Sequence, residues 1–532
     1  MQEKIFYEID FTTSGILGEK GVELARTMPK CDGIVLYAWC APETVKELEN
    51  TFKVPILNFN STQLYVDSTK RAYELASKWA EEGPLGPSGY PILRAIETSV
   101  ADELSYIYFK EAIREKVKKH FNQSPVVFKI FPENVNTYTS TPRSFFRAVK
   151  SLRDQMQGAD RFWQDLVSSV DKDFKFRAVA NKFLSGPELS ENDVWLFSSY
   201  ENFSKALSEY GPKDARFLLS RMKNPSYIER SRRQSPLFLW RFSRENNANE
   251  SRKVAKAASS SFDSIKDSLQ MNDYNEILNN LKLTIYESVL SYYVEESLLN
   301  NFVEAVKPRE LWVADQWGSE RLLINVAKSF SIPVVQVQHG FPSIYYGYSP
   351  LVADKTIVSS SRWKRYFNGE VEVLASAENA RSSTKDKDDG RNAIVFTTPF
   401  QLVKFFNDEI STHEMMYLIA MFANKNFNVV LRIHPSDSKS KWRNSIKSHR
   451  LERLISIDKN AKIGETLIRS NVGIAYFSTA LEDCETNQVQ SLGLSWQLHP
   501  GWSALSDSDW IFEMDSIEKI SEWLFSKGFK VE

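Results

Sequence analysis

The sequence of 532 residues has little cysteine and no excess of either charge. Its three cysteines are Cys31, Cys40 and Cys484, which form neither a disulfide framework nor a set of metal ligands at a known spacing. Lys and Arg number 67 and Asp and Glu 68, so the formal net charge is −1. Nucleic-acid-binding domains are usually basic. This composition therefore argues against a secreted disulfide-rich protein and against a nucleic-acid partner.

The sequence also lacks an uncharged apolar stretch that is long enough to span a bilayer. Its first residues, Met-Gln-Glu-Lys-Ile, do not form the basic and apolar regions of a signal peptide. We therefore expect a soluble, cytoplasmic protein.

Short apolar strands do recur along the chain, and many are separated by helical segments. They are expected at 5–9, 34–39, 54–59, 126–131, 194–197, 311–314, 334–338 and 356–358, and in a second series at 394–396, 429–433, 454–457, 472–477, 494–498 and 510–513. This alternation predicts an α/β protein with parallel sheets covered by helices. Its length requires more than one core, and a polar stretch at 382–390 separates the predicted domains, 1–375 and 391–532.

Two segments of the first domain have helical signals and are predicted to be insertions, near 141–190 and at 203–302. A local loop is expected at 257–261. Residues 228–256 hold eight Lys or Arg against three Glu. We favour a solvated helix face for this segment. The alternative is a surface for an anionic glycan or a lipid headgroup, which implies peripheral contact at the inner face of the membrane.

Two histidines follow strand-like apolar runs, in Val-Val-Gln-Val-Gln-His-Gly at 334–340 and in Val-Val-Leu-Arg-Ile-His-Pro at 429–435. Ligands of open α/β sheets bind beyond the carboxyl ends of the strands, so His339 and His434 are candidates for one cleft. Asp315, after the strand at 311–314, suits a catalytic carboxylate, although capping the next helix is an equally good explanation. Gly340 permits a sharp turn or a close backbone approach to a ligand.

The second histidine motif has features of a phosphate site. Arg432 lies two residues before His434 and so on the same face of a strand, from which both are expected to offer cationic donors. A packed or capping histidine is the structural alternative, and His499-Pro500 is a rival motif. Ser478 and Thr479 stand where a strand feeds into a helix, whose N-terminus attracts anions. Thr479 and Glu482 also fit a capping box, in which Glu482 contacts no ligand. Both explanations can hold for different atoms, so Glu482 is also a candidate for the donor site, ranked below Ser478.

The order His-Gly, His-Pro and then Ser-Thr resembles a group of GT-B glycosyltransferases and phosphotransferases. It is similar to bacterial capsule-type Kdo transferases, to CDP-glycerol glycerophosphotransferases and, in its His-Pro and Ser-Thr parts, to bacterial sialyltransferases; the resemblance covers about 309–500. It implies two Rossmann-like domains facing a central cleft. It also implies that His434 with Pro435, Ser478 and Thr479 hold the donor phosphate, and that His339 lies near the reacting centre.

These residues predict a glycosyltransferase of bacterial surface polysaccharide synthesis that uses a CMP-activated 3-deoxy sugar acid such as Kdo and a glycan or lipid-linked glycan acceptor. Asp315 or His339 would take the acceptor proton, and Glu133 is a further candidate carboxylate, although a turn residue beside Pro132 is the simpler explanation. No metal or other cofactor is expected. The alternatives are a CDP-polyol phosphotransferase, a nucleotide-sugar 2-epimerase-like enzyme and a non-catalytic glycan-binding scaffold.

Overall fold

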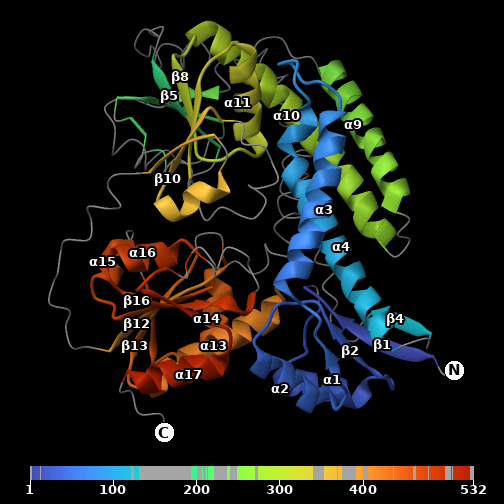
Figure 1. Ribbon diagram of the computed structural model, residues 1–532, viewed down its shortest axis with the longest axis vertical. Coiled ribbons are helices and arrows are strands. Elements are labelled where there is room, and N and C mark those ends of the chain that lie inside the picture. Colours follow the sequence, from blue (N-terminus) through green and yellow to red (C-terminus); the bar gives the residue numbers. More distant parts are fainter. Residues whose placement is uncertain are drawn as a thin grey trace, which may run out of the picture. The chain divides into compact units, whose positions relative to one another are not determined.

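The computed structural model is an α/β protein with three parallel sheets (Figure 1), as the alternation of strands and helices predicts. The structure describes residues 3–11, 13–121, 125–130, 193–199, 207, 211–212, 214–220, 237–239, 248–269, 274–338, 353–367, 369–373, 391–398, 405–434, 437–458, 463–476, 478–497, 505 and 507–527. Within them, no helix is both long enough and apolar enough to cross a membrane.

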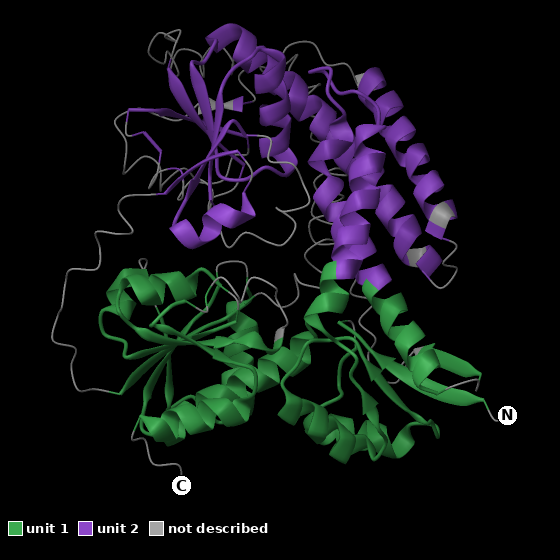
Figure 2. Cartoon of the chain, viewed as in Figure 1, with its two compact units in different colours: residues 1–66, 109–154, 376–532 green, residues 67–108, 155–375 purple. Residues whose placement is uncertain are grey.

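The chain divides into two compact units (Figure 2). Unit 1 comprises Met1–Val66, Phe109–Asp154 and Ser376–Glu532, and unit 2 comprises Asp67–Tyr108 and Gln155–Ala375. The divisions at 66/67 and 108/109 fall within the long helices α3 (Thr62–Glu81) and α4 (Glu97–His120). This division differs from the predicted domains, 1–375 and 391–532, because the first 66 residues belong with the C-terminal part of the chain.

Unit 1 contains two sheets. The four-stranded sheet has the order β3-β2-β1-β4, with β1 (Lys4–Ile9), β2 (Gly33–Leu36), β3 (Ile56–Leu57) and β4 (Val126–Ile130). The six-stranded sheet has the order β14-β13-β12-β15-β16-β17, with β12 (Asn392–Phe396), β13 (Asn428–Arg432), β14 (Ile455–Ile457), β15 (Val472–Ala475), β16 (Gln490–Leu494) and β17 (Ile511–Met514). The strand predicted at 494–498 is wrong, because β16 ends at Leu494 and a 3-10 turn, η8 (Ser495–Gln497), follows it.

Helices connect the strands of both sheets. The shorter sheet has α1 (Gly18–Thr27) and α2 (Pro42–Phe52), and the longer one has α13 (Asp408–Asn424), α14 (Lys439–Ser448), α15 (Ile463–Leu467), α16 (Ala480–Thr486) and α17 (Ile517–Ser526). Proline at the start of α2 and the Asn407 cap of α13, which accepts two backbone N–H groups, are ordinary start signals of helices.

Unit 2 contains the third sheet, in the order β11-β10-β9-β8-β5-β6-β7. Its strands are β5 (Val194–Ser198), β6 (Arg216–Leu219), β7 (Leu237–Phe238), β8 (Glu310–Val313), β9 (Val334–Val337), β10 (Lys355–Val358) and β11 (Glu370–Val373). Its helices are α9 (Ala248–Leu269), α10 (Asn275–Val306) and α11 (Gly318–Ser329), with the 3-10 turns η1 (Ile92–Ala95) and η5 (Ser361–Tyr366).

The predicted insertions are only partly recovered. The segment 203–302 is not wholly helical, because β6 and β7 extend the sheet beside β5 before α9 and α10 begin. The loop predicted at 257–261 is wrong: these residues lie within α9, where Ala258 is fully buried and Ser259 Oγ donates to Lys282 O of α10 at 3.3 Å. Small side chains there permit close packing of two helices. The segment 141–190 and the stretch 382–390 lie outside the described residues.

Two of the sheets have the strand order of a Rossmann fold. Numbered along the chain, the strands of the six-stranded sheet follow the order 3-2-1-4-5-6, and those of the seven-stranded sheet follow the same order with one more strand at the end. The two Rossmann-like sheets that a GT-B fold contains are therefore present, and the four-stranded sheet is an addition to them. In such sheets the order reverses at one point, where ligands bind beyond the carboxyl ends of the strands.

Within unit 1, a buried carboxylate on α13 links the four-stranded sheet to the six-stranded one. Glu414 is 1% exposed and accepts hydrogen bonds from Ala41 N–H (2.7 Å) and Thr44 Oγ1 (2.8 Å) at the start of α2. It also accepts from Tyr476 Oη (3.0 Å), just after β15, and from Trp496 Nε1 (3.0 Å). Four donors from three parts of the chain thus satisfy one carboxylate, which explains why residues far apart in the sequence form one unit.

Close packing of α16 on β15 depends on Gly473. A Cβ atom added at this position would lie 2.5 Å from Cys484 Sγ, which is fully buried. We expect Gly473→Ala to lower the free energy of unfolding by about 1–3 kcal/mol through overpacking. Gly464→Ala is the matched control, because no heavy atom lies within 4 Å of a Cβ added there. Urea denaturation of both variants tests this, and equal stabilities would show that α16 moves freely to make room.

Candidate functional site

The structure describes six of the ten residues predicted for the site. Glu133, His339, Gly340 and Pro435 lie outside the described residues, as does the rival motif His499-Pro500. The described residues, Asp315, Arg432, His434, Ser478, Thr479 and Glu482, fall at the carboxyl edges of the two Rossmann-like sheets. Among the described residues, no group of three His, Cys, Asp or Glu side chains is placed to hold a metal ion.

At the six-stranded sheet, the strand order reverses between β12 and β15. Thr397 follows β12, His434 follows β13 and Ser478 follows β15, so the predicted residues stand on both sides of this point. Thr397, which sequence reasoning missed, joins two of the strand ends. Its Oγ1 accepts from His434 N–H at 2.8 Å, and its own N–H donates to Arg432 O at 3.0 Å. The backbone around His434 is therefore fixed from the neighbouring strand.

The charges of this edge differ from the predicted pair of cations. Arg432 forms an ion pair with Asp458, which follows β14 and also accepts from Thr466 Oγ1 at 2.9 Å. Burial lowers the pKa of His434, although the charge of Asp437 opposes the shift. His434 is therefore a neutral imidazole at neutral pH, which offers one N–H donor rather than a positive charge.

Ser478 and Thr479 precede the short helix α16. Ser478 Oγ accepts from Ala480 N–H at 3.3 Å, and its hydroxyl hydrogen is a donor that a ligand oxygen can accept. Thr479 is the cap residue of α16, but its side chain makes no capping hydrogen bond. The capping box proposed as the structural alternative for Thr479 and Glu482 is therefore wrong. Glu482 lies in the first turn of α16, where a second negative charge disfavours phosphate, so Ser478 is the stronger ligand candidate.

At the seven-stranded sheet, the strand order reverses between β5 and β8. Leu196 pairs with Trp312 across these strands, and the same offset places Ser199 level with Asp315. Ser199 and Glu320, both missed by sequence reasoning, complete this edge. Glu320 Oε1 accepts from Ser199 N–H at 3.0 Å, and Ser199 Oγ lies 2.7 and 2.8 Å from the two carboxyl oxygens.

Two carboxyl groups at this edge have raised pKa values. Burial raises the pKa of Glu320 to about 8, against the hydrogen bonds from Ser199, and the charge of Asp315 raises it further. Burial also raises the pKa of Asp315 to about 7, against the bond from Gln316 N–H at 2.7 Å. Part of Asp315 stays exposed, as a carboxylate that meets a substrate requires. A base with a pKa near neutrality suits proton abstraction at physiological pH.

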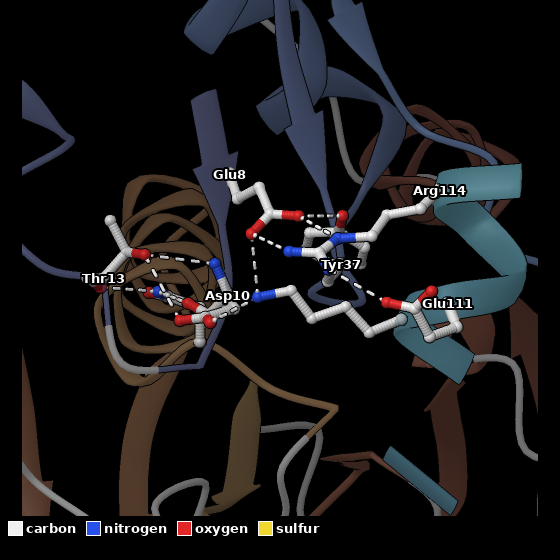
Figure 3. Close-up of polar contacts among 8 residues, drawn as sticks. Glu8, Asp10, Thr13, Tyr37, Glu111 and Arg114 are labelled. Atoms are coloured by element: carbon white, nitrogen blue, oxygen red, sulfur yellow. Dashed lines mark hydrogen bonds and ion pairs between the residues drawn. The ribbon is translucent and has the colours of Figure 1, made fainter. Parts of the chain in front are cut away.

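The carboxyl end of β1 in the four-stranded sheet holds a buried ionic cluster instead of an open edge (Figure 3). Arg114 binds both carboxylate oxygens of Glu8, through Nε at 2.7 Å and Nη2 at 2.9 Å, and Tyr37 Oη donates to Oε1 at 2.5 Å. Lys110 Nζ lies 3.0 Å from Glu8 Oε2 and 3.3 Å from Asp10 Oδ2. Each charge has an opposite partner, so this cluster is suited to stability.

Backbone N–H groups after β1 are also occupied. Glu409 of α13 accepts from three successive ones, at Gly15, at Ile16 (3.1 Å) and at Leu17 (3.0 Å), just before α1 begins. This strand-to-helix turn is where Rossmann domains bind a diphosphate. Here the Glu409 carboxylate of the same unit occupies the position, so these three N–H groups are not open to a phosphate.

Of the basic segment 228–256, the structure describes 237–239 and 248–256. In the described part, Lys253 pairs with Glu250 at 3.3 Å, and both side chains are exposed, at 74% and 50%. This contact fits a solvated helix face. Contact with a membrane or an anionic glycan remains an expectation for this segment.

No family model matches the chain, and no curated protein matches it in sequence. Solved structures with some likeness include the UDP-GlcNAc 2-epimerase of Methanocaldococcus jannaschii (10% identity, TM-score 0.39, covering 64% of this chain and 94% of that one). TarM (8%, 0.38, 64% and 92%) and MurG of Acinetobacter baumannii (8%, 0.34, 64% and 91%) are two others. The residues of this chain are therefore the basis for the function proposed below.

Proposed function

We propose that this chain is a glycosyltransferase that uses a nucleotide-sugar donor and a hydroxyl-bearing acceptor. The observation that carries the proposal is the placement of the predicted residues: His434 and Ser478 lie at the reversal point of one Rossmann-like sheet, and Asp315 lies at that of the other. Such points bind ligands in open α/β sheets. The two points differ in chemistry. The one with N–H and O–H donors suits a donor phosphate, and the one with carboxyl groups suits an acceptor hydroxyl.

In this proposal, the acceptor oxygen bonds to the anomeric carbon of the donor sugar while the bond from that carbon to the phosphate oxygen breaks. The electron pair leaves with the phosphate, and the acceptor proton goes to Asp315. Negative charge grows on the departing phosphate, where His434 and the Ser478 hydroxyl offer fixed donors. The finer part of the proposal is a CMP-linked 3-deoxy sugar acid such as Kdo and a glycan acceptor of the bacterial surface, which the order of the His-Gly, His-Pro and Ser-Thr motifs supports.

Thermal-shift measurements with CMP, CDP, UDP and GDP test the donor site. We expect CMP to stabilise the chain, because a ligand that binds only the native state raises its stability by RT ln(1 + L/Kd), where L is the free ligand concentration. His434→Ala removes one hydrogen bond to a charged phosphate and is expected to weaken CMP binding by roughly 10-fold or more. His449→Ala is the matched control, because this exposed histidine follows the last residue of α14, where it bonds to Ser445 and Ser448 and its ring lies 6.2 Å from that of His413.

The outcomes distinguish the alternatives. Protection by UDP or GDP without CMP or CDP would reject the cytidine nucleotide, and equal CMP protection in His434→Ala would reject this phosphate ligand. Conversion of a lone nucleotide sugar into its epimer would identify an epimerase. Transfer of a phosphate together with the polyol would identify a phosphotransferase.

A further inference from the structure

A buried carboxyl group, Glu320, and a half-buried one, Asp315, share one end of the seven-stranded sheet, and no described cation forms an ion pair with either. Glu320 is 1% exposed and lies in the first turn of α11, close enough to Asp315 for its pKa to respond to that charge. Neither group forms an ion pair within the described part of the chain. Two neighbouring carboxylates in such a place do not both ionise easily, because each charge opposes the other and burial keeps water from Glu320.

Ser199 determines which of the two groups is held in place. Its N–H and Oγ both bond to the Glu320 carboxyl group, and it follows β5 directly. Among the described residues, Asp315 accepts one hydrogen bond, from the neighbouring Gln316 N–H, and part of its surface is exposed. Glu320 is thus anchored inside, while Asp315 stays accessible.

A third group at this edge has an unsatisfied side chain. Gln316 follows Asp315 and is fully buried, and neither its amide oxygen nor its amide nitrogen has a hydrogen-bond partner among the described residues. A buried amide without partners costs free energy. A ligand whose hydroxyl groups both donate and accept hydrogen bonds would satisfy such an amide, and the negative charge of ionised Asp315 disfavours an anion in the same place.

We propose that Glu320 is a positioning residue, held by Ser199, that keeps a proton beside Asp315 and thereby leaves Asp315 as the single base for a neutral, polyhydroxylated acceptor. This inference rests on the proposed function for its acceptor class. The acceptor O–H bond breaks, its proton goes to Asp315, and its oxygen forms the new bond to the donor carbon as the phosphate leaves. Glu320 keeps its own proton throughout.

Other charged groups lie at this end of α11. Ser319 Oγ donates to Glu295 of α10 at 2.9 Å, and the next residue, Arg321, lies near Arg94 and Glu97. Glu295 and Arg321 remain in every variant below, so they act equally on all of them.

The first experiment measures CMP release from CMP-Kdo against pH. In the wild type we expect activity to rise as Asp315 ionises and to fall as Glu320 loses its proton. Glu320→Gln keeps a neutral side chain at all pH values and is expected to retain the acid limb and lose the alkaline limb. Glu320→Ala is expected to lower kcat by at least 10-fold, because Asp315 then loses its neighbour. An unchanged alkaline limb in Glu320→Gln would overturn the inference.

A second experiment needs no turnover and so separates this inference from the proposed function. A carboxyl group whose pKa is raised on folding costs stability as the pH rises from its unfolded value to its folded value. Urea denaturation at about pH 5 and about pH 9 is therefore expected to show a smaller loss of stability for Glu320→Gln than for the wild type. Equal losses would overturn the inference. If the losses differ as expected and CMP-Kdo is not turned over, the donor assignment fails and the carboxyl pair stands.

Discussion

Replacement of Arg114 with alanine is expected to lower the free energy of unfolding by roughly 3 kcal/mol or more, because it leaves Glu8 buried without its main partner. Glu8 and Arg114 are 6% and 8% exposed, and the guanidinium binds both carboxylate oxygens. Lys110 and Tyr37 remain to satisfy part of the charge, so the loss lies at the lower end of what breaking a buried ion pair costs (Figure 3).

Lys118→Ala is the matched control on the same helix. Lys118 pairs with Glu115 at 2.7 Å, but the two side chains are 47% and 55% exposed, and such surface pairs contribute about 1 kcal/mol at most. Urea denaturation of both variants at neutral pH gives the comparison. Equal losses would mean that the cluster at the end of β1 adds nothing beyond a surface pair.

The same cluster should make the free energy of unfolding depend on pH in the acid range. Burial raises the pKa of Glu8, but the hydrogen bonds and charges of Arg114 and Lys110 outweigh it, and the net pKa is lowered. A lowered carboxyl pKa contributes stability above the unfolded value, and this contribution is lost as the pH falls through the folded value. The difference in stability between the wild type and Arg114→Ala should therefore shrink as the pH falls below about 4.

Local pattern predicted most strands, and the misses have a common cause. Runs such as Val-Val-Leu at 429–431 are apolar and β-branched, which favours a strand wherever they stand. Strand β6, Arg-Phe-Leu-Leu, lies in a segment whose neighbours have helical signals, and β11, Glu-Val-Glu-Val, is an edge strand with exposed charges and half-buried valines. These strands exist because a neighbouring strand offers backbone partners, which no short window of sequence contains.

The division into units could not be predicted from local sequence pattern, for the same reason. Asn407 Nδ2 donates to Asp10 O at 2.8 Å and to Thr13 O at 2.7 Å, across almost four hundred residues of sequence. A prediction made along the chain places residues 1–66 with the strands that follow them. The structure instead joins them to α13, through polar contacts between residues that carry no special motif.

At the candidate site, the sequence predicted which residues follow the strands, but not the neighbouring groups that bond to them and set their charge. Asp315, His434 and Ser478 follow apolar runs and were predicted from that position. Ser199 and Thr397 also follow strands, but only the pairing of β5 with β8 and of β12 with β13 shows which residues they meet. The charges at this edge were the least predictable part. His434 is neutral because it is buried, and the charge of Arg432 is balanced by Asp458, which follows a different strand.

Asp315→Asn is expected to reduce transfer by roughly 10²- to 10⁴-fold, the usual contribution of general acid–base catalysis. The asparagine Oδ1 can still accept from Gln316 N–H, so the backbone after β8 should keep its conformation. Burial that raises the pKa of Asp315 to about 7 also means that the ionised carboxylate costs stability above that pH, and the neutral amide removes this cost. At about pH 8 the variant should therefore be at least as stable as the wild type while its activity is lost.

Asp354→Asn is the matched control for this substitution. Asp354 accepts a backbone N–H from Val334 at 2.8 Å, as Asp315 does from Gln316, but it precedes β10 and so lies at the amino edge of the same sheet. Transfer should stay within about 2-fold of the wild type in this variant, since ligands meet the carboxyl edge. Equal losses in the two variants would assign the effect to folding. Full activity in Asp315→Asn would move the base to another residue. The two substitutions remove the same charge from opposite edges of one sheet. The ratio of the two transfer rates therefore measures what the position of Asp315 contributes to catalysis.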